Sequence, residues 1–362
     1  MKKKLLLIPL ALLLAISLIA IGCPGEETTT PPPTKTTTPP PTTTAPPEPI
    51  SLVINDHNPP GTGPAVSVDY WAEYVEQESG GMLDLEVIHG AALFTGDEIY
   101  GQLESSGCDG GVYVVDREDG FLLNLVLTLP FLGWPEQHFE DAFWTLMDEY
   151  PEYAAEWEGV TVISVLMMPG TQFNTVDKVI ATPADVAGVK MFCAEASLVN
   201  IFDAVGGTGV ELPITEMAPS VATGVVDGVF NHYPVCNVFG ALELMHCHTV
   251  FGAGVNNTPM FLLMSTDVLN GLPGDLKDLL LNSGDAWFGK FKEMDDRDMG
   301  VSLKLCEDNN DTFVYLTPSE VAEWRGLIKD DVIDTWIADC VAAGLPGQAV
   351  FDRVLELISE MS

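Results

Sequence analysis

Residues 50–87, ISLVINDHNPPGTGPAVSVDYWAEYVEQESGGMLDLEV, carry the pattern that decides the fold. The apolar run Ile50–Ile54 predicts a buried strand. Residues 66–78 have apolar side chains at helical spacing and stop at two glycines, and residues 83–87 alternate as a second strand. A strand, a helix and a strand in this order predict two parallel strands joined by a right-handed crossover.

The same alternation continues downstream. Thr182-Pro183-Ala184-Asp185 has the features of a helix start, with a capping Thr, Pro in the first turn and an acid three residues on. Two successive series of this kind predict an α/β protein of two lobes, with the chain crossing between them more than once. The predicted strands are 110–115, 160–167, 189–193, 225–230 and 261–265, and the predicted helices are 97–105, 137–150, 198–205, 215–223, 276–305 and 319–343.

Upstream, the chain begins with the features of a secretory signal. Lys2, Lys3 and Lys4 precede an apolar run that ends in small residues before Cys23. This resembles a bacterial lipobox, whose cysteine is acylated, and we expect residues 1–22 to be removed. The alternative is a membrane-spanning helix, because the run has about the minimum length for one. Both place the rest of the chain outside the cytoplasmic membrane.

Residues 23–49 are rich in Thr and Pro and almost free of apolar side chains after Cys23. Such a segment cannot bury enough surface to offset the entropy of ordering, so we expect a disordered, extended tether. The remaining residues are numerous and apolar enough for two cores.

The net charge of −38, from 53 acidic and 15 basic residues, argues against nucleic acid as a partner. Six cysteines follow Cys23, an even number that permits disulfides outside the cell, but their spacing is not diagnostic and buried thiols are an equal alternative. The triplet His246-Cys247-His248 has metal-binding residue types. Because neighbours on a strand point to opposite faces, the three cannot readily converge, and we predict no metal or other cofactor.

Several segments together resemble the solute-binding proteins of tripartite ATP-independent periplasmic (TRAP) transporters, of the DctP type. Each motif is weak alone, and the order and spacing carry the resemblance over about 250 residues. The segments are 71–81 (WAEYVEQESGG), 129–132 (LPFL), 182–190 (TPADVAGVK), 213–216 (PITE), 223–228 (TGVVDG) and 272–273 (LP).

The resemblance implies a two-lobed periplasmic binding protein type II fold, each lobe a mixed sheet flanked by helices, with a long helix spanning the hinge. It implies a receptor that is not an enzyme, takes a small organic solute into the cleft between the lobes, and delivers it to TRAP membrane permease subunits. We expect lobe I to comprise 50–170 and about 258–298, lobe II 171–257 and about 299–345, and a C-terminal helix 346–362.

Ligands of open α/β sheets bind beyond the carboxyl ends of the strands. By this rule the candidate cleft residues are His57 and Asn58 after the first strand, Phe192 and Glu195 at the 189–193 strand, and Asn231, His232 and Tyr233 after the 225–230 strand. Asn231 also matches an asparagine that often contacts the ligand in the family. Two further aromatic candidates are Trp134 and Phe131.

The chain departs from the family where the ligand carboxylate is normally held. The family pattern G-x-K-x-R, whose arginine forms a two-pronged salt bridge, here ends in Phe192. Thr171 and Gln172 occupy a second stretch that often carries a basic residue. An organic acid as ligand is therefore in doubt, and a neutral or aromatic solute stacked on Phe192 fits better, with a cation held by Glu195 as a variant.

Two other functions stay open from the sequence. A sensory binding protein that presents its ligand to a receptor would have the same features. A surface hydrolase is disfavoured because G-x-S-x-G and H-E-x-x-H are both missing from the sequence.

Overall fold

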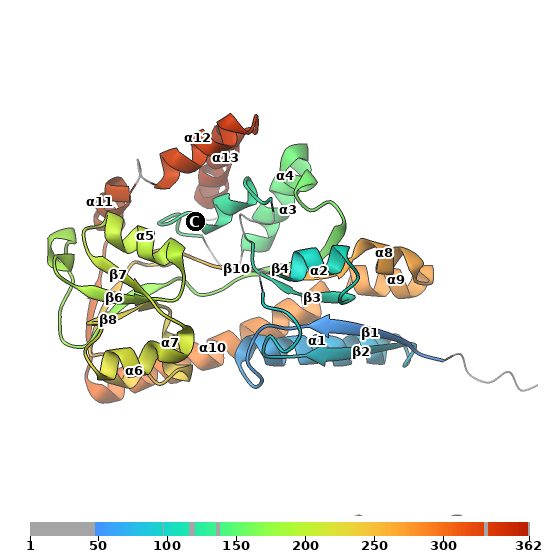
Figure 1. The fold of residues 1–362 in the computed structure, drawn as a ribbon, viewed down its shortest axis with the longest axis horizontal. Coiled ribbons are helices and arrows are strands. Elements are labelled where there is room, and N and C mark those ends of the chain that lie inside the picture. Colours follow the sequence, from blue (N-terminus) through green and yellow to red (C-terminus); the bar gives the residue numbers. More distant parts are fainter. Residues whose placement is uncertain (1–47, 97, 116–119, 135–137, 329–331, 361–362) are drawn as a thin grey trace, which may run out of the picture. The chain divides into compact units, whose positions relative to one another are not determined.

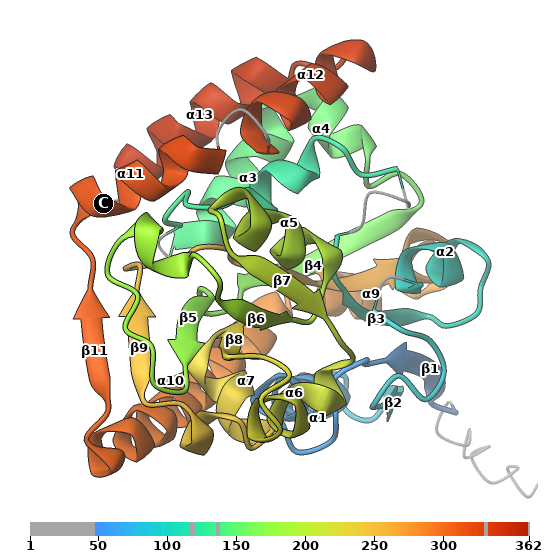
Figure 2. The same ribbon diagram turned by 60° about the vertical axis from the view of Figure 1, so that its left-hand side comes forward.

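The computed structural model describes residues 48–362 apart from 97, 116–119, 135–137, 329–331 and 361–362. The predicted signal, Cys23 and most of the tether lie outside the described residues. Two mixed sheets flanked by helices form the folded region, which confirms the predicted two-lobed α/β class (Figures 1 and 2). Within the described residues, no helix combines the length and apolar character needed to cross a membrane.

The first sheet has the strand order β2-β1-β3-β10-β4. Its strands are β1 (Ile50–Asn55), β2 (Leu83–Ile88), β3 (Gly110–Tyr113), β4 (Val160–Met167) and β10 (Pro259–Ser265). The predicted parallel pairing of β1 with β2 is confirmed, with Ile50 opposite Leu83. β10 runs antiparallel to both β3 and β4, so a late segment returns to this sheet as predicted.

Alternating side chains of the first sheet enter two cores. Leu52 and Ile54 pack with Trp71 of α1, whereas Phe261 and Leu263 of β10 pack with the opposite cluster. Helices cover both faces, which explains why β4 and β10 are nearly continuously apolar, whereas the edge strand β2 alternates. The helices are α1 (Gly63–Glu78), α8 (Thr266–Gly271), α9 (Gly274–Leu281) and α10 (Gly284–Asn309) on one side, and α2 (Ile99–Glu104), η1 (Asn124–Thr128), α3 (Phe139–Glu149) and α4 (Pro151–Ala155) on the other.

The second sheet has the order β11-β9-β5-β8-β6-β7 (Figure 2). It contains four short strands that sequence analysis missed. They are β5 (Gln172–Thr175), β7 (Thr208–Glu211), β9 (Cys247–Val250) and β11 (Thr312–Tyr315); β6 (Lys190–Cys193) and β8 (Gly228–Asn231) match predicted strands. The surrounding elements are η3 (Pro183–Val186), α5 (Ala196–Ala204), η4 (Ile214–Glu216), α6 (Met217–Ala222), α7 (Tyr233–Val238), η5 (Leu242–Leu244) and α11 (Pro318–Ile328).

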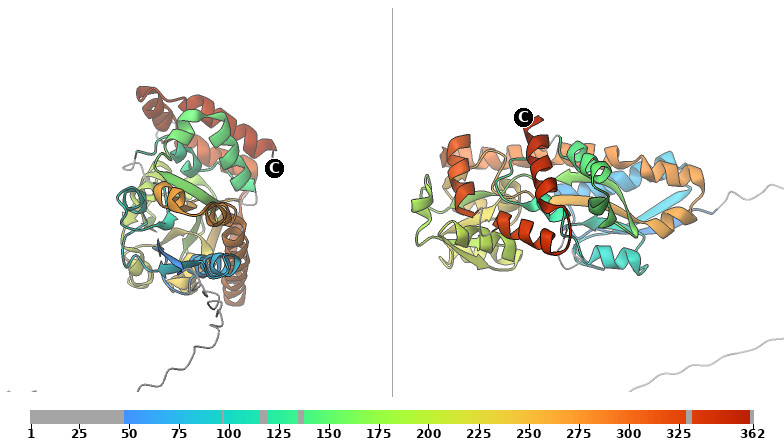
Figure 3. Two further views of the ribbon diagram at one scale, coloured as in Figure 1. Left: turned by 90° about the vertical axis from the view of Figure 1, so that its right-hand side faces the viewer. Right: turned by 90° about the horizontal axis from the view of Figure 1, so that it is seen from above.

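Two predicted long helices are interrupted. The 276–305 helix is divided into α9 and α10, and the 319–343 helix into α11 and α12 (Asp334–Ala342), with 329–331 between them outside the described residues. Trp336 and Cys340 of α12 pack in the core on the α3 side of the first sheet, together with α13 (Gly347–Glu360). The expectation that lobe II extends to about residue 345 is therefore wrong for α12, which lies with α13 on the side of α3 (Figure 3).

The chain passes between the two sheets through residues 168–171 and 251–258. These segments touch at Gly170 and Gly254, where a Cβ on either residue would meet the other segment's backbone. α10 also joins the lobes, because it packs against α1 and β4 of the first and α7 of the second. Within the described residues no disulfide links the cysteines, and Cys247 alone of the six is less than fully buried.

Candidate functional site

A cavity of about 390 Å³ lies where strands of both sheets end. His57 and Asn58 follow β1, Glu195 follows β6, and Asn231 ends β8. Thr171 enters from the crossing segment. The structure thus brings the predicted candidates together around one cavity, at the carboxyl ends of strands, where ligands of such sheets bind. They are His57, Asn58, Thr171, Glu195 and Asn231.

The other predicted site residues do not line this cavity. Phe192 is fully buried and packs in a core with Met217, Val221 and Val229. The cavity lining on this strand starts two residues later, at Ala194. Strand alternation directs Phe192 into that core while Met191 and Cys193 enter the opposite one.

Gln172 and Tyr233 line a separate hollow of about 230 Å³. The side chain of Gln172 accepts the backbone N–H of Phe251 at 2.8 Å and so joins the two crossing segments. Phe131 packs on Phe251 in the second lobe, and Trp134 packs edge-on against Phe139 in the first. None of the four therefore lines the cavity: Gln172, Tyr233 and Phe131 adjoin the crossing segments, and Trp134 belongs to the core of the first lobe.

A buried carboxylate shapes the loop after β1. Asp56 accepts hydrogen bonds from the backbone N–H and the side-chain amide of Asn58, at 3.1 and 2.7 Å, and lies 2.7 Å from His89 Nδ1. The other nitrogen of His89 lies 2.8 Å from Asp69. Burial lowers the pKa of His89, but the bonds to Asp56 and Asp69 outweigh it, so the pKa is raised overall. The two carboxylates therefore favour the charged form of the His89 ring.

The polar groups of the cavity have defined roles. His57 Nδ1 lies 3.1 Å from the carbonyl of Val112, which can only accept, so Nδ1 carries the proton and Nε2 is left for another group. The side-chain oxygen of Asn231 accepts a hydrogen bond from the backbone N–H of His232 at 2.8 Å. The side-chain amide nitrogen of Asn231 has no acceptor in the described part of the chain. It can therefore donate to a ligand.

His232 is a buried histidine at the cavity wall. Its Nδ1 makes no hydrogen bond to any described residue, and desolvation lowers the pKa of the ring to about 4. A buried polar atom without a partner costs free energy, which a ligand group can recover by bonding to it.

Helix α10 adds residues to the cavity that were not predicted from the sequence. Phe291, Asp295 and Asp298 lie on one face of this helix and line the cavity, and Asp298 pairs with Arg297 at 2.7 Å. Their spacing of four and three residues places them on one helix face, but it does not show that this face meets the strand ends. Most of the remaining wall is apolar: Pro59, Pro64, Val114, Met168, Leu198, Ile214, Pro234, Val235, Val238, Phe239 and Met260.

A larger hollow of about 830 Å³ lies elsewhere. Asn200 and Asp203 of α5, Leu129 and Pro130 after η1, and Trp336 of α12 line it. Fewer strands end there, since only Val115 after β3 and Ala196 after β6 contribute, whereas β1, β3, β6 and β8 all end at the smaller cavity. The smaller cavity is therefore the candidate site.

The chain matches known proteins along most of its length. The model of the family "Bacterial extracellular solute-binding protein, family 7" matches residues 55–337. A solute-binding protein of Chromohalobacter salexigens is 24% identical over 196 residues, which are 53% of this chain and 58% of that relative. The alignment thus spans less than two thirds of the relative.

Solved structures share the fold. A TRAP solute-binding protein from Rhodoferax ferrireducens, in complex with copurified benzoate, superposes with a TM-score of 0.74 at 20% identity, over 86% of this chain and 98% of that one. A marine metagenome TRAP protein specific for aromatic acid ligands, in complex with metahydroxyphenylacetate, gives 0.75 at 23% identity, over 86% and 99%. The family match over residues 55–337 shows that this chain belongs to the bacterial extracellular solute-binding proteins of family 7.

Proposed function

We propose that the cavity at the strand ends captures a small organic solute and that the chain delivers it to a TRAP-type membrane permease. The observation that carries this proposal is the convergence of His57 and Asn58 from the first sheet with Glu195 and Asn231 from the second on one cavity. A solute held by both lobes stabilises their closed arrangement, since it binds that arrangement better than an open one.

The test compares the two cavities. Asn231→Ala removes a donor from the proposed site, and Asn200→Ala is the matched change in the larger hollow. Native mass spectrometry of the gently purified protein identifies a retained solute, and calorimetry with that solute measures both variants. We expect Asn231→Ala to weaken binding about 5- to 10-fold, from one lost hydrogen bond, and Asn200→Ala to leave it unchanged. The reverse pattern would move the site to the larger hollow.

We further propose that the solute is neutral or aromatic and is not held by an arginine clamp. Phe192 stands where the family arginine is expected, and Glu195, Asp295 and Asp298 surround the cavity with carboxylates that disfavour an anion. The apolar wall supplies the main binding area, and Asn231, His57 and His232 orient the polar edge of the solute.

Benzoate and benzamide form a matched pair for this proposal, because they share a ring and differ in charge. We expect benzamide to bind at least as tightly as benzoate, with little dependence on salt. Tight binding of benzoate alone, weakened by salt, would show that an acid is the solute. The structures of relatives with benzoate and metahydroxyphenylacetate make this comparison necessary.

We also propose that Cys23 is acylated and that residues 24–49 tether the folded region outside the cytoplasmic membrane. The basic start, the apolar run and the small residues before Cys23 support this. Globomycin or Cys23→Ala should leave the precursor unprocessed, as seen by its mobility and by loss of the acylated N-terminus. Normal processing under both treatments would contradict a lipid anchor.

A further inference from the structure

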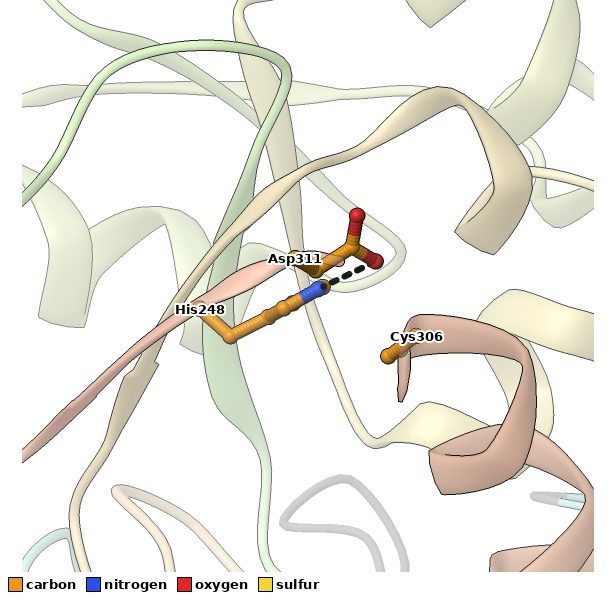
Figure 4. Close-up of side chains that lie close together, drawn as sticks. All are labelled: His248, Cys306 and Asp311. Atoms are coloured by element: carbon orange, nitrogen blue, oxygen red, sulfur yellow. Dashed lines mark hydrogen bonds and ion pairs between the residues drawn. The ribbon is translucent and has the colours of Figure 1, made fainter. Parts of the chain in front are cut away.

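Three buried side chains outside the solute cavity form a compact cluster. His248 on β9, Cys306 near the end of α10 and Asp311 before β11 bring an imidazole nitrogen, a thiol and a carboxylate oxygen within 4.8 Å of one another (Figure 4). The side chains of His248 and Asp311 are 0% exposed, and Cys306 is equally buried. Polar groups so deeply buried require partners.

Asn174 fixes the orientation of the histidine ring. Its amide nitrogen donates to the carbonyl of Asn231 at 2.9 Å, so its oxygen faces His248 Nδ1 at 2.8 Å and accepts a hydrogen bond from the N–H there. The lone pair of the neutral ring is then on Nε2, which lies 3.3 Å from Asp311 Oδ2. Two acceptors that face each other in a buried site repel unless a proton or a cation lies between them.

Outer hydrogen bonds hold both the ring and the carboxylate. The second oxygen of Asp311 lies 2.8 Å from His246 Nδ1, whose side chain is 52% exposed. Asn174 on the imidazole and His246 on the carboxylate are the kind of outer partners that orient metal ligands.

We propose that His248 Nε2, Cys306 Sγ and Asp311 Oδ2 bind a divalent transition-metal ion, with zinc the best match. Thiolate, imidazole and carboxylate are the ligands that zinc takes in proteins, whereas calcium and magnesium require oxygen ligands. Zinc takes four ligands, so one position beyond these three is left for water or another group. The set differs from the sequence triplet 246–248, because two of its members come from α10 and the turn that follows it.

Binding replaces a proton. The thiolate, and not the thiol, binds a metal ion, so the Cys306 thiol must lose its proton on binding. The metal–sulfur bond forms as the S–H bond breaks, and the proton leaves to the buffer. The bound ion would join the end of α10 to β9 and β11, and Asn174 connects it to the backbone of Asn231 at the solute cavity.

The test uses the tag-free full chain after chelator treatment. Co²⁺ serves as a spectroscopic probe, and we expect a thiolate-to-metal charge-transfer band and tetrahedral d–d bands. Zinc should bind at one ion per chain and raise the melting temperature. Cys306→Ser and Asp311→Asn each remove a proposed ligand, so each should weaken zinc binding by at least the roughly 10- to 100-fold that is typical for loss of an outer partner. Cys108→Ser, which removes another buried thiol near the first sheet, should not.

Each contrary result overturns the proposal. A Co²⁺ complex without the thiolate band, or equal zinc affinity in Cys306→Ser, would show an adventitious ion only, bound by surface carboxylates. Absence of zinc binding at micromolar concentration would show that a proton bridges His248 and Asp311. If Cys306→Ser does not fold, the Co²⁺ spectrum of the unmodified chain still decides whether sulfur is a ligand.

Discussion

Asp56 holds Asn58 by two hydrogen bonds, from its backbone N–H at 3.1 Å and from its side-chain amide at 2.7 Å. A buried carboxylate thereby sets the conformation of the loop that brings Asn58 and His57 to the cavity. His89 pairs with the same carboxylate and with the exposed Asp69. Positioning of the candidate site thus depends on a residue that does not line the cavity.

Asp56→Asn should therefore reduce both stability and solute binding. The change removes a charge-assisted bond to His89 from a buried site, and we expect the free energy of unfolding to fall by about 2–3 kcal/mol. Urea denaturation measures the loss, and calorimetry measures binding of the retained solute. Asp69→Asn is the matched control, because its side chain is 52% exposed and should contribute less than about 1 kcal/mol. Equal losses in both variants would argue against a special role for Asp56.

The second prediction concerns Phe192. Because this residue lies in the core and does not line the cavity, changing it should affect stability more than solute binding. Phe192→Ala should lower the free energy of unfolding by about 3–5 kcal/mol, since it opens a cavity beside Met217 and Val229. Phe192→Leu should cost less and leave solute affinity near that of the unmodified chain. Urea denaturation and calorimetry on the same samples check both expectations. A large loss of affinity in Phe192→Leu with little loss of stability would show that the ring contacts the solute.

Long periodic segments made much of this fold predictable. Residues 50–87 gave β1, α1 and β2 with their parallel pairing, because apolar periodicity over this length has few alternatives. β5, β7, β9 and β11 were missed because each mixes polar and apolar side chains over only four residues, whereas the equally short β3, β6 and β8 lie in longer, mostly apolar stretches. β5, with the sequence Gln-Phe-Asn-Thr, buries two amide side chains that bond to backbone distant in the sequence. Asn174 donates to the carbonyl of Asn231, and Gln172 accepts from the N–H of Phe251.

The candidate site was predictable from the sequence only where it depends on the order of strands and helices. The strand-end rule identified His57, Asn58, Glu195 and Asn231, since it depends only on topology. It failed for Phe192, where the family's contact position carries an apolar side chain that packs into the core. Residues of α10 could not be placed without the tertiary structure, because nothing local shows that Phe291 and Asp295 face the strand ends.

The break between α9 and α10 supplies a third prediction. Gly284 begins α10 against β4, where a Cβ would lie 2.6 Å from the carbonyl of Ile163. Ser283 in the break accepts a hydrogen bond from Trp71 Nε1 at 2.7 Å, and both groups are buried. Ser283→Ala leaves the indole N–H without a partner, so the free energy of unfolding should fall by about 1–3 kcal/mol.

Ser302→Ala is the control for this change. Ser302 is equally buried, but its hydroxyl donates to the carbonyl of Asp298 within the same helix at 2.7 Å, so its removal leaves no donor unsatisfied. Such back-bonding contributes little to helix stability. Chemical denaturation of both variants should therefore separate them, and equal losses would indicate that the Trp71 bond is not important.

The last prediction concerns the dependence of stability on pH. Desolvation lowers the pKa of His232 to about 4 in the folded chain, whereas an unfolded histidine has a pKa of about 6.5. Between these values the unfolded chain binds a proton that the folded chain does not. The free energy of unfolding must then fall as the pH falls from about 6.5 to about 4, by up to about 3 kcal/mol from this residue, and the contribution is constant below that window.

Carboxylates also titrate in this range, so a difference between variants isolates the histidine. His232→Gln should lose less stability than the unmodified chain between pH 6.5 and 4, as measured by urea denaturation at successive pH values. Asn231→Ala removes the neighbouring cavity group without removing the titrating ring, and it should keep the original slope. Parallel curves for His232→Gln and the unmodified chain would mean that the ring is protonated without cost in the folded protein. Water or a solute group would then reach Nδ1, which has no partner among the described residues.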